Sequence, residues 1–299
     1  MKTTFIEFAA ADGILLQGLL FEADQRSNAS AAVAHLHGLA GSFYENAFIR
    51  VMAEQYTASG VAFLSFNNRG HDYIADLRVV GQKPGSRQGG GAHEVFSECT
   101  LDVVAAVGAL EHAGYRHVYL QGHSTGANKA VYAVADRGAR LNVSGIILMS
   151  PCDDIALMLK ARGSEMDADQ EEATLLKDAG NGDQLLRRSV FFSYPLSANA
   201  YLRDFRPGSA MDVFRYREPA TSWGWSESIA VPMLATFGGE GDLLQQEPHD
   251  ALRILRSQAK RCPDFTGVVV PGSGHSYSGK ERAIAELVRD WVLGRCARA

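Results

Sequence analysis

The chain has 299 residues, 46% of them hydrophobic and 21% charged, with a formal net charge of −5. This is ordinary globular composition with ample length for a large core. No basic stripe is visible, which argues against a nucleic-acid partner. No apolar run approaches the roughly 18 residues of a membrane span, and the amino-terminal stretch lacks the apolar segment of a signal peptide. We therefore expect a cytoplasmic protein that does not bind membranes.

The four cysteines lie far apart in the sequence, at Cys99, Cys152, Cys262 and Cys296. No pair has the spacing of a metal site or a redox motif, and a disulfide framework is not expected. We predict that the protein uses no metal and no organic cofactor.

The first half of the chain alternates between strand-like and helix-like segments. Two β-rich runs, 5–9 and 14–22, flank an Asp12-Gly13 turn and predict an antiparallel hairpin. The elements expected next are a strand at 31–36, a helix at 44–59, a strand at 61–66, a glycine-rich loop at 73–91, a helix at 94–113, a strand that begins at 118, a helix to about 138 and a strand at 143–149.

The pattern changes after the strand at 143–149. Residues 152–229 hold charged helical stretches and many aromatics without strand–helix alternation, and we interpret them as an insertion. Alternation resumes over residues 230–299, with strands expected at 231–237 and 266–270 and helices at 248–259 and 280–294. The prediction is an α/β protein with a mostly parallel, doubly wound sheet, a core formed by 1–151 and 230–299, and a site at the carboxyl ends of the strands.

The segment Gly122-His123-Ser124-Thr125-Gly126 lies between an apolar β-type run and a small-residue helical run. This G-x-S-x-G context is typical of a nucleophilic serine held in a strained turn. The two glycines are needed because the positions on either side pack too closely for side chains. Ser124 is therefore the predicted nucleophile.

A serine nucleophile needs a base, and the base needs an acid partner. His275 follows the strand at 266–270, and Asp242 follows the strand at 231–237, so both would lie at the same sheet edge as Ser124. We predict His275 as the base and Asp242 as the acid. Glu240 is the nearest rival acid, and Asp153 with Asp154 are weaker rivals because they follow an earlier strand.

An oxyanion hole requires backbone N–H groups aimed at the developing negative charge. One is predicted from Thr125, directly after the nucleophile, and the other from Leu39 in the loop that follows the strand at 31–36. His37 opens that loop. It is a candidate for holding the loop in place or for contacting substrate.

The chain resembles the α/β-hydrolase fold serine hydrolases. The matching elements occur in the family's order and are His37-Gly38, Asn68-Arg69-Gly70-His71, Gly122-His123-Ser124-Thr125-Gly126, Gly239-Glu240-Gly241-Asp242 and Gly274-His275. The resemblance implies an eight-stranded sheet with an antiparallel second strand and a lid inserted after the sixth strand. One departure is Asn67-Asn68 before Arg69, where the family usually has an aspartate.

A less specific resemblance concerns residues 122–129, 195–198 and 211–214. They are similar to a group of esterase-like proteins that includes fungal enzymes hydrolysing ester bonds of siderophores. This resemblance favours an ester as the substrate.

The insertion at 152–229 is the expected lid, and it is rich in aromatic residues. Tyr194, Phe214 and Trp223 are predicted to line a substrate pocket, with a small core of the lid itself as the alternative. The glycine-rich loop at 73–91 is expected to be a mobile rim. Arg69 is expected to pair with an acid beneath the site, or else to touch substrate.

These observations predict a hydrolase that cleaves a carboxylic ester of a small molecule, such as a lactone or a bulky secondary metabolite, through an acyl-enzyme on Ser124. Amide or peptide hydrolysis and acyl transfer would use the same residues. A non-catalytic binding protein on the same fold is the third hypothesis. The sequence leaves the substrate and the oligomeric state open.

Overall fold

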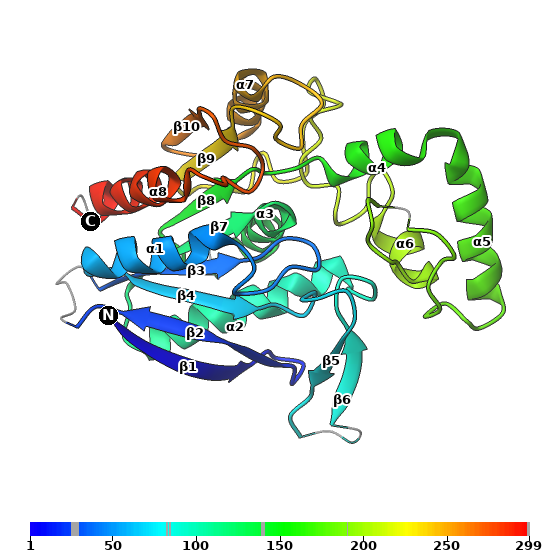
Figure 1. Cartoon of the computed structure of the whole chain (residues 1–299), viewed down its shortest axis with the longest axis horizontal. Helices are drawn as coiled ribbons and strands as arrows, with labels where there is room; N and C mark the ends of the chain where they lie inside the picture. The colour runs from blue at the N-terminus through cyan, green and yellow to red at the C-terminus, as the bar shows by residue number, and fades with distance from the viewer. Residues whose placement is uncertain (25–29, 82, 84, 139–140, 190, 298–299) are drawn as a thin grey trace.

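A computed structural model describes residues 1–24, 30–81, 83, 85–138, 141–189 and 191–297 (Figure 1). Its main feature is an eight-stranded sheet in the order β1-β2-β4-β3-β7-β8-β9-β10. The strands are β1 (Lys2–Ala9), β2 (Leu15–Glu22), β3 (Ala31–Leu36), β4 (Ala62–Asn67), β7 (His117–His123), β8 (Gly145–Met149), β9 (Met233–Gly238) and β10 (Phe265–Val270).

Strand β2 pairs antiparallel with both of its neighbours, β1 and β4, whereas the strands from β4 to β10 are parallel to one another. The sequence prediction of a mostly parallel sheet with an antiparallel second strand is therefore confirmed. The central strands β3 and β8 are buried along their whole length, as expected where helices cover both faces. The carboxyl ends of the parallel strands consequently meet at one edge of the sheet.

Helices cover both faces of this sheet (Figure 1). Helices α1 (Ala47–Ala58) and α8 (Glu281–Cys296) pack together on one face, and α2 (Cys99–His112), α3 (Thr125–Arg137) and α7 (Pro248–Gln258) contribute to the core on the other. The buried residues of α1 recur every three or four positions, which gives the helix one apolar stripe. This helix begins three residues later than the expected 44–59.

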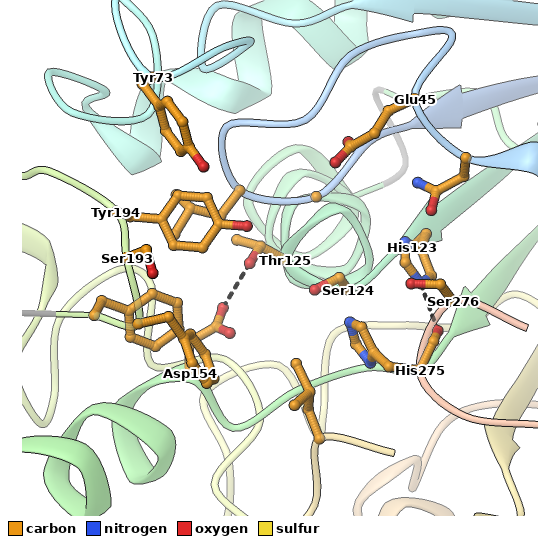
Figure 2. Close-up of a pocket in the computed structure, with 16 residues that line it drawn as sticks. Glu45, Tyr73, His123, Ser124, Thr125, Asp154, Ser193, Tyr194, His275 and Ser276 are labelled. Atoms are coloured by element: carbon orange, nitrogen blue, oxygen red, sulfur yellow. Dashed lines mark hydrogen bonds between the residues drawn. The ribbon is translucent and has the colours of Figure 1, made fainter. Parts of the chain in front are cut away.

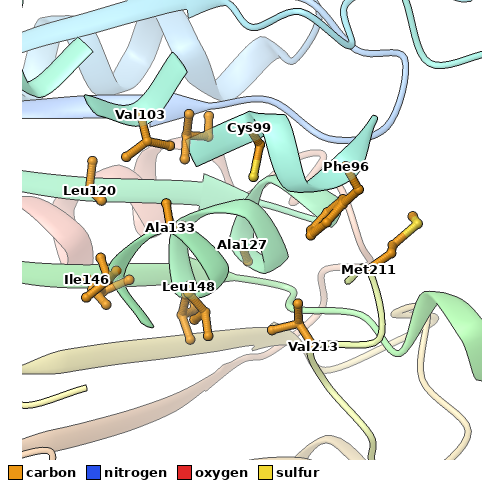
Figure 3. Packing of buried hydrophobic residues seen from close by; sticks show 14 of the residues in the cluster. Phe96, Cys99, Val103, Leu120, Ala127, Ala133, Ile146, Leu148, Met211 and Val213 are labelled. Atoms are coloured by element: carbon orange, nitrogen blue, oxygen red, sulfur yellow. The ribbon is translucent and has the colours of Figure 1, made fainter. Parts of the chain in front are cut away.

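Small residues let α3 lie close to the strands that precede and follow it. Figure 3 shows Ala127 and Ala133 of α3 in the same buried cluster as Leu120 of β7 and Leu148 of β8. All four side chains are fully buried. The close approach brings the amino end of α3, directly after Ser124, to the carboxyl edge of the sheet.

The glycine-rich segment at 73–91 is not the plain loop that the sequence predicted. It contains an antiparallel hairpin of β5 (Ala75–Arg78) and β6 (Ser86–Gly89), which projects from the main sheet (Figure 1). Leu77 is buried, and its side chain lies where a Cβ on Gly89 would stand. A single buried apolar residue among polar ones gives no alternating pattern, which is why the sequence did not reveal the hairpin.

The segment between β8 and β9 holds a 3-10 turn (Gly163–Glu165) and the helices α4 (Asp154–Arg162), α5 (Met166–Asp178) and α6 (Ala198–Asp204). These helices lie together at one end of the molecule (Figure 1). A second 3-10 turn (Phe96–Glu98) precedes α2, so the helix expected from residue 94 begins later. Of the helices in the described part of the chain, none combines the length and apolarity that a membrane crossing requires.

Candidate active site

Ser124 sits in a sharp turn between β7 and α3. Its backbone has φ 57° and ψ −133°, a left-handed conformation that is unusual for a residue with a side chain. A Cβ on Gly122 would collide with the carbonyl of Gly126, and one on Gly126 would collide with the carbonyl of Leu36. The two glycines of the motif therefore permit the turn, and the Ser124 side chain lines a pocket (Figure 2).

His275 and Asp242 meet on the loops after β10 and β9. The His275 Nδ1 atom lies 2.8 Å from Asp242 Oδ1. The other carboxylate oxygen of Asp242 accepts hydrogen bonds from Ser150 Oγ and the Gly238 amide, each at 2.7 Å. Burial acts to raise the pKa of Asp242, but the bonds from His275, Ser150 and Gly238 outweigh it and leave the pKa below its ordinary value. The carboxylate is thus ionised at neutral pH and orients the imidazole.

The rival acids have other partners. Glu240 is exposed. Asp153 caps α4 through the Ala156 amide at 2.8 Å and pairs with Arg217 at 2.6 Å. Asp154 accepts a hydrogen bond from the Thr125 hydroxyl at 3.0 Å. Of the four carboxylates weighed in the sequence, Asp242 is the one that contacts His275.

His123 holds the backbone of His275 in place. Its Nε2 donates to the His275 carbonyl at 2.8 Å, and the two rings lie 4.9 Å apart (Figure 2). Burial lowers the pKa of His123 to about 3, so the ring stays neutral. His123, the residue directly before Ser124, therefore helps to position His275.

Three fully buried histidines with lowered pKa values, His35, His37 and His123, should make stability depend on pH. Burial lowers the pKa of His35, like that of His123, to about 3 from an ordinary value of 6.5. Unfolded histidine takes up its proton first, so the free energy of unfolding should fall as the pH drops from 6.5 toward 3. Below about pH 6, we expect ~1.4 kcal/mol per pH unit from each histidine, measured by urea denaturation.

The His35→Gln variant isolates one of these contributions. His35 Nδ1 accepts a hydrogen bond from the Gln121 side-chain amide at 2.9 Å, a contact that another amide side chain can replace. The variant should lose one histidine's share of the pH slope. An unchanged slope would contradict the assignment.

The pocket beside Ser124 has a volume of about 430 Å³ and includes His275, Leu39 and Thr125 in its wall. Thr125 is the first residue of α3, so its N–H has no acceptor within the helix. A Cβ on Gly38 would stand 3.1 Å from the Ser124 Cβ, so glycine lets this loop pass close to the nucleophile. The two amides predicted for an oxyanion hole thus border the same pocket as Ser124.

His37 supports the loop from behind and does not line the pocket. It is fully buried, its Nδ1 donates to the Gly38 carbonyl at 2.9 Å, and its Nε2 accepts from the Asn68 amide at 3.1 Å. Asn68 Oδ1 in turn accepts from Lys129 Nζ at 3.0 Å, and Lys129 pairs with Glu94 at 2.6 Å.

The loop that the resemblance expects to open with an aspartate opens with Asn67, whose Oδ1 accepts from the Phe43 amide at 2.9 Å. The lysine is received by the amide oxygen of the next residue, Asn68, and by the carboxylate of Glu94.

Arg69 is almost fully buried and pairs with acids. Its guanidinium lies 3.0 Å from Asp12, 2.6 Å from Glu98 and 2.8 Å from Asp102. Of the two roles considered for Arg69, the structure shows pairing with acids.

The lid residues proposed for the pocket separate into two groups. Tyr194 lines it, whereas Phe214 and Trp223 do not and are about 1–2% exposed. They pack edge to face at 6.2 Å in a cluster with Tyr216 and Trp225. The prediction that Phe214 and Trp223 line the pocket is therefore wrong. The rings pack against one another because large apolar rings that lie close together exclude water from each other's surfaces.

The sequence analysis missed several pocket residues, Glu45 and Phe191 among them, and took Asp154 only as a rival acid. Tyr73 lines the pocket from the segment 73–91, which the sequence analysis expected to form a rim. Glu45 precedes α1, so it neither follows a strand end nor belongs to a motif. The strand-end position of Asp154 was a signal that could have placed it.

The profile of the Alpha/beta hydrolase family matches residues 33–289. The chain belongs to this family. A search of curated proteins returned no match.

Three solved structures show the same fold at low sequence identity. Est1E from Butyrivibrio proteoclasticus with bound ferulic acid has a TM-score of 0.66 and 19% identity, covering 97% of this chain and 99% of that one. An esterase from Pyrococcus furiosus has 0.60 and 17%, covering 99% and 91%. The α/β hydrolase GrgF from a Penicillium species has 0.67 and 16%, covering 100% and 99%.

Proposed function

We propose that this protein is a serine hydrolase that cleaves carboxylic esters through an acyl-enzyme on Ser124. The observation that carries the proposal is the 2.8 Å contact between the buried Asp242 carboxylate and His275, which lines the same pocket as Ser124. Serine is a weak nucleophile by itself, and this pairing supplies a base in the right tautomer.

The chemistry follows from these positions. His275 Nε2 takes the proton from Ser124 Oγ as the oxygen attacks the ester carbonyl, and Asp242 stabilises the imidazolium. The amides of Leu39 and Thr125 hold the oxyanion. The alcohol leaves with the proton from His275. Water, deprotonated by the same imidazole, then attacks the acyl-enzyme and releases the acid.

The preference for esters has outside support. Two of the similar structures are an esterase and Est1E with ferulic acid, a carboxylic acid of the kind that ester cleavage releases. Amide hydrolysis and acyl transfer remain the alternatives that use the same triad. A non-catalytic binding protein is the less favoured one, because candidates for all three triad members are present.

We further propose that residues 152–229 act as a lid between the two core parts, 1–151 and 230–299. Tyr194 supports this role, since it brings the segment to the pocket wall. A small-molecule ester as the substrate, no nucleic-acid partner and a cytoplasmic location complete the proposal, consistent with the net charge of −5.

The test is a matched panel of p-nitrophenyl esters and the corresponding p-nitroanilides, together with labelling by a fluorophosphonate. We expect stoichiometric labelling and faster turnover of each ester than of its anilide, with a dependence on acyl length. Faster anilide cleavage would favour the amidase. A folded protein that neither labels nor turns over any member would favour the binding protein.

A further inference from the structure

The charged groups in the wall of the pocket are of one sign. Among its described lining residues, the carboxyl side chains are Glu45 and Asp154, and none is a lysine or arginine. Glu45 comes from the segment before α1, and Asp154 is the buried first residue of α4, so two distant parts of the chain bring negative charge to one cavity.

Aromatic rings border the same cavity. Tyr73 and Tyr194 meet edge to face with centroids 5.3 Å apart, and Phe191 lies 6.2 Å from Tyr194. In Figure 2 the two tyrosines and Asp154 lie across the pocket from His275. The faces of such rings attract cations.

The carboxyl groups of Glu45 and Asp154 and the ring of Tyr194 border the same part of the pocket. Burial raises the pKa of Tyr194, and the neighbouring Tyr73, Glu45 and Asp154 raise it further. Both carboxylates are therefore close enough to this hydroxyl to influence it. A positive group placed beside Tyr194 would receive the attraction of both.

Lys129, the basic residue that influences Asp154, already has other partners. Lys129 acts on Asp154 from behind, but its ammonium is held by Glu94 and Asn68. Asp154 itself accepts hydrogen bonds from Thr125 at 3.0 Å and Asn128 at 3.3 Å, both neutral groups. The negative charge in the pocket is thus only partly compensated from within the protein.

We propose that this pocket selects esters that carry a positive charge, such as an ammonium or trimethylammonium group, over neutral esters of the same shape. The inference rests on the proposed esterase function. The bound cation lies between Glu45, Asp154 and the tyrosine rings, while the ester carbonyl lies at Ser124. Glu45 and Tyr73 are exposed at the rim of the pocket and Asp154 is buried deeper in its wall. Coulomb attraction and the cation–π contact both favour this arrangement.

The preference should increase with pH. Burial and the neighbouring Asp153 together raise the pKa of Asp154 to about 7, against the opposing effects of the Thr125 hydrogen bond and Lys129. The nearby Cys152 thiol and Tyr194 hydroxyl, whose pKa values are both raised, remain neutral in this range. Asp154 gains its charge as the pH rises through about 7, and the cationic substrate then gains more than the neutral one.

The experiment uses two pairs of esters. In one pair the acyl chain of a p-nitrophenyl ester ends in trimethylammonium or in the isosteric tert-butyl group. In the other pair the alcohol carries the same two groups. We expect kcat/KM to favour the cationic member of at least one pair by about ten-fold, with a ratio that rises from about pH 6 to 8. Taking the ratio removes every pH effect that the two members of a pair share.

Three variants connect the ratio to its source. Glu45→Gln should reduce it at least about threefold, and Asp154→Asn should reduce it and remove its rise with pH. Glu54→Gln is the matched control, because it removes one carboxylate from the outer surface of α1, where Glu54 pairs with Arg50 at 3.7 Å. This control should keep the wild-type ratio.

Binding to Ser124→Ala, measured by calorimetry with the same esters, separates the two proposals. Tighter binding of the cationic ester without any turnover by wild type would refute the esterase and leave the selectivity standing. Equal or faster turnover of the tert-butyl esters in both pairs would overturn the selectivity and leave the esterase standing. Equal ratios in Glu45→Gln and wild type would also overturn it.

Discussion

The Ser124→Ala variant is expected to lose ester hydrolysis by roughly three to six orders of magnitude in kcat, and to lose fluorophosphonate labelling completely. In the proposed mechanism, the Ser124 Oγ atom forms the bond to the acyl group, and no neighbouring group in the turn can replace it. Residual turnover would come from the amides of Leu39 and Thr125 and from substrate binding. The measurements are initial rates on the p-nitrophenyl series and intact mass after labelling.

The control for this variant is Ser257→Ala on α7. Its hydroxyl donates to the Ile254 carbonyl at 2.6 Å on an exposed face, so the change is the same but lies outside the pocket. It should label and turn over like wild type. If Ser124→Ala folds and still labels at another residue, the assignment of the nucleophile is wrong.

The Asp242→Asn variant is expected to reduce kcat by about 10³–10⁴ with a smaller change in KM. Asparagine keeps the shape but loses the charge that stabilises the imidazolium, and its amide nitrogen would oppose the His275 Nδ1–H. The hydrogen bonds from Ser150 and Gly238 also lose their charged acceptor, at 2.7 Å each. Initial rates over a range of substrate concentrations separate the loss in kcat from the change in KM.

Glu240→Gln provides the comparison. Glu240 lies two residues away and is exposed, so the same change of carboxylate to amide should alter kcat less than about twofold. A larger loss in Glu240→Gln than in Asp242→Asn would identify Glu240 as the acid. Thermal unfolding of both variants shows whether the loss belongs to the chemistry or to the fold.

Much of the site could be predicted because its residues follow strands. A parallel sheet brings the carboxyl ends of its strands to one edge, so Ser124, Asp242 and His275 converge although up to 151 positions separate them. The glycines beside Ser124 were readable for a local reason, since only glycine fits the turn. The sequence could not predict the contact between His275 and Asp242. The contact depends on the conformations of two loops and on Ser150, from a third loop, which holds the Asp242 carboxylate.

The residues of the pocket wall could not be predicted from the sequence pattern. Phe214 and Trp223 had the composition of pocket residues and instead form a buried cluster, because burial of aromatic rings depends on which rings lie nearby. Glu45 belongs to no motif, and its place in the pocket results from how the loops around the site fold over it.

By itself, the sequence predicted the family, the order of the candidate triad residues along the chain and Ser124 as the candidate nucleophile, since these predictions rest on periodicity and on steric rules between neighbours in the chain. Only the tertiary structure decided the lining of the pocket and its charge. Glu45 and Asp154 are 109 positions apart, and no local rule relates two carboxylates that meet across a cavity. The proposed selectivity depends on such pairs of distant residues lining one pocket, which results from the packing of the whole chain.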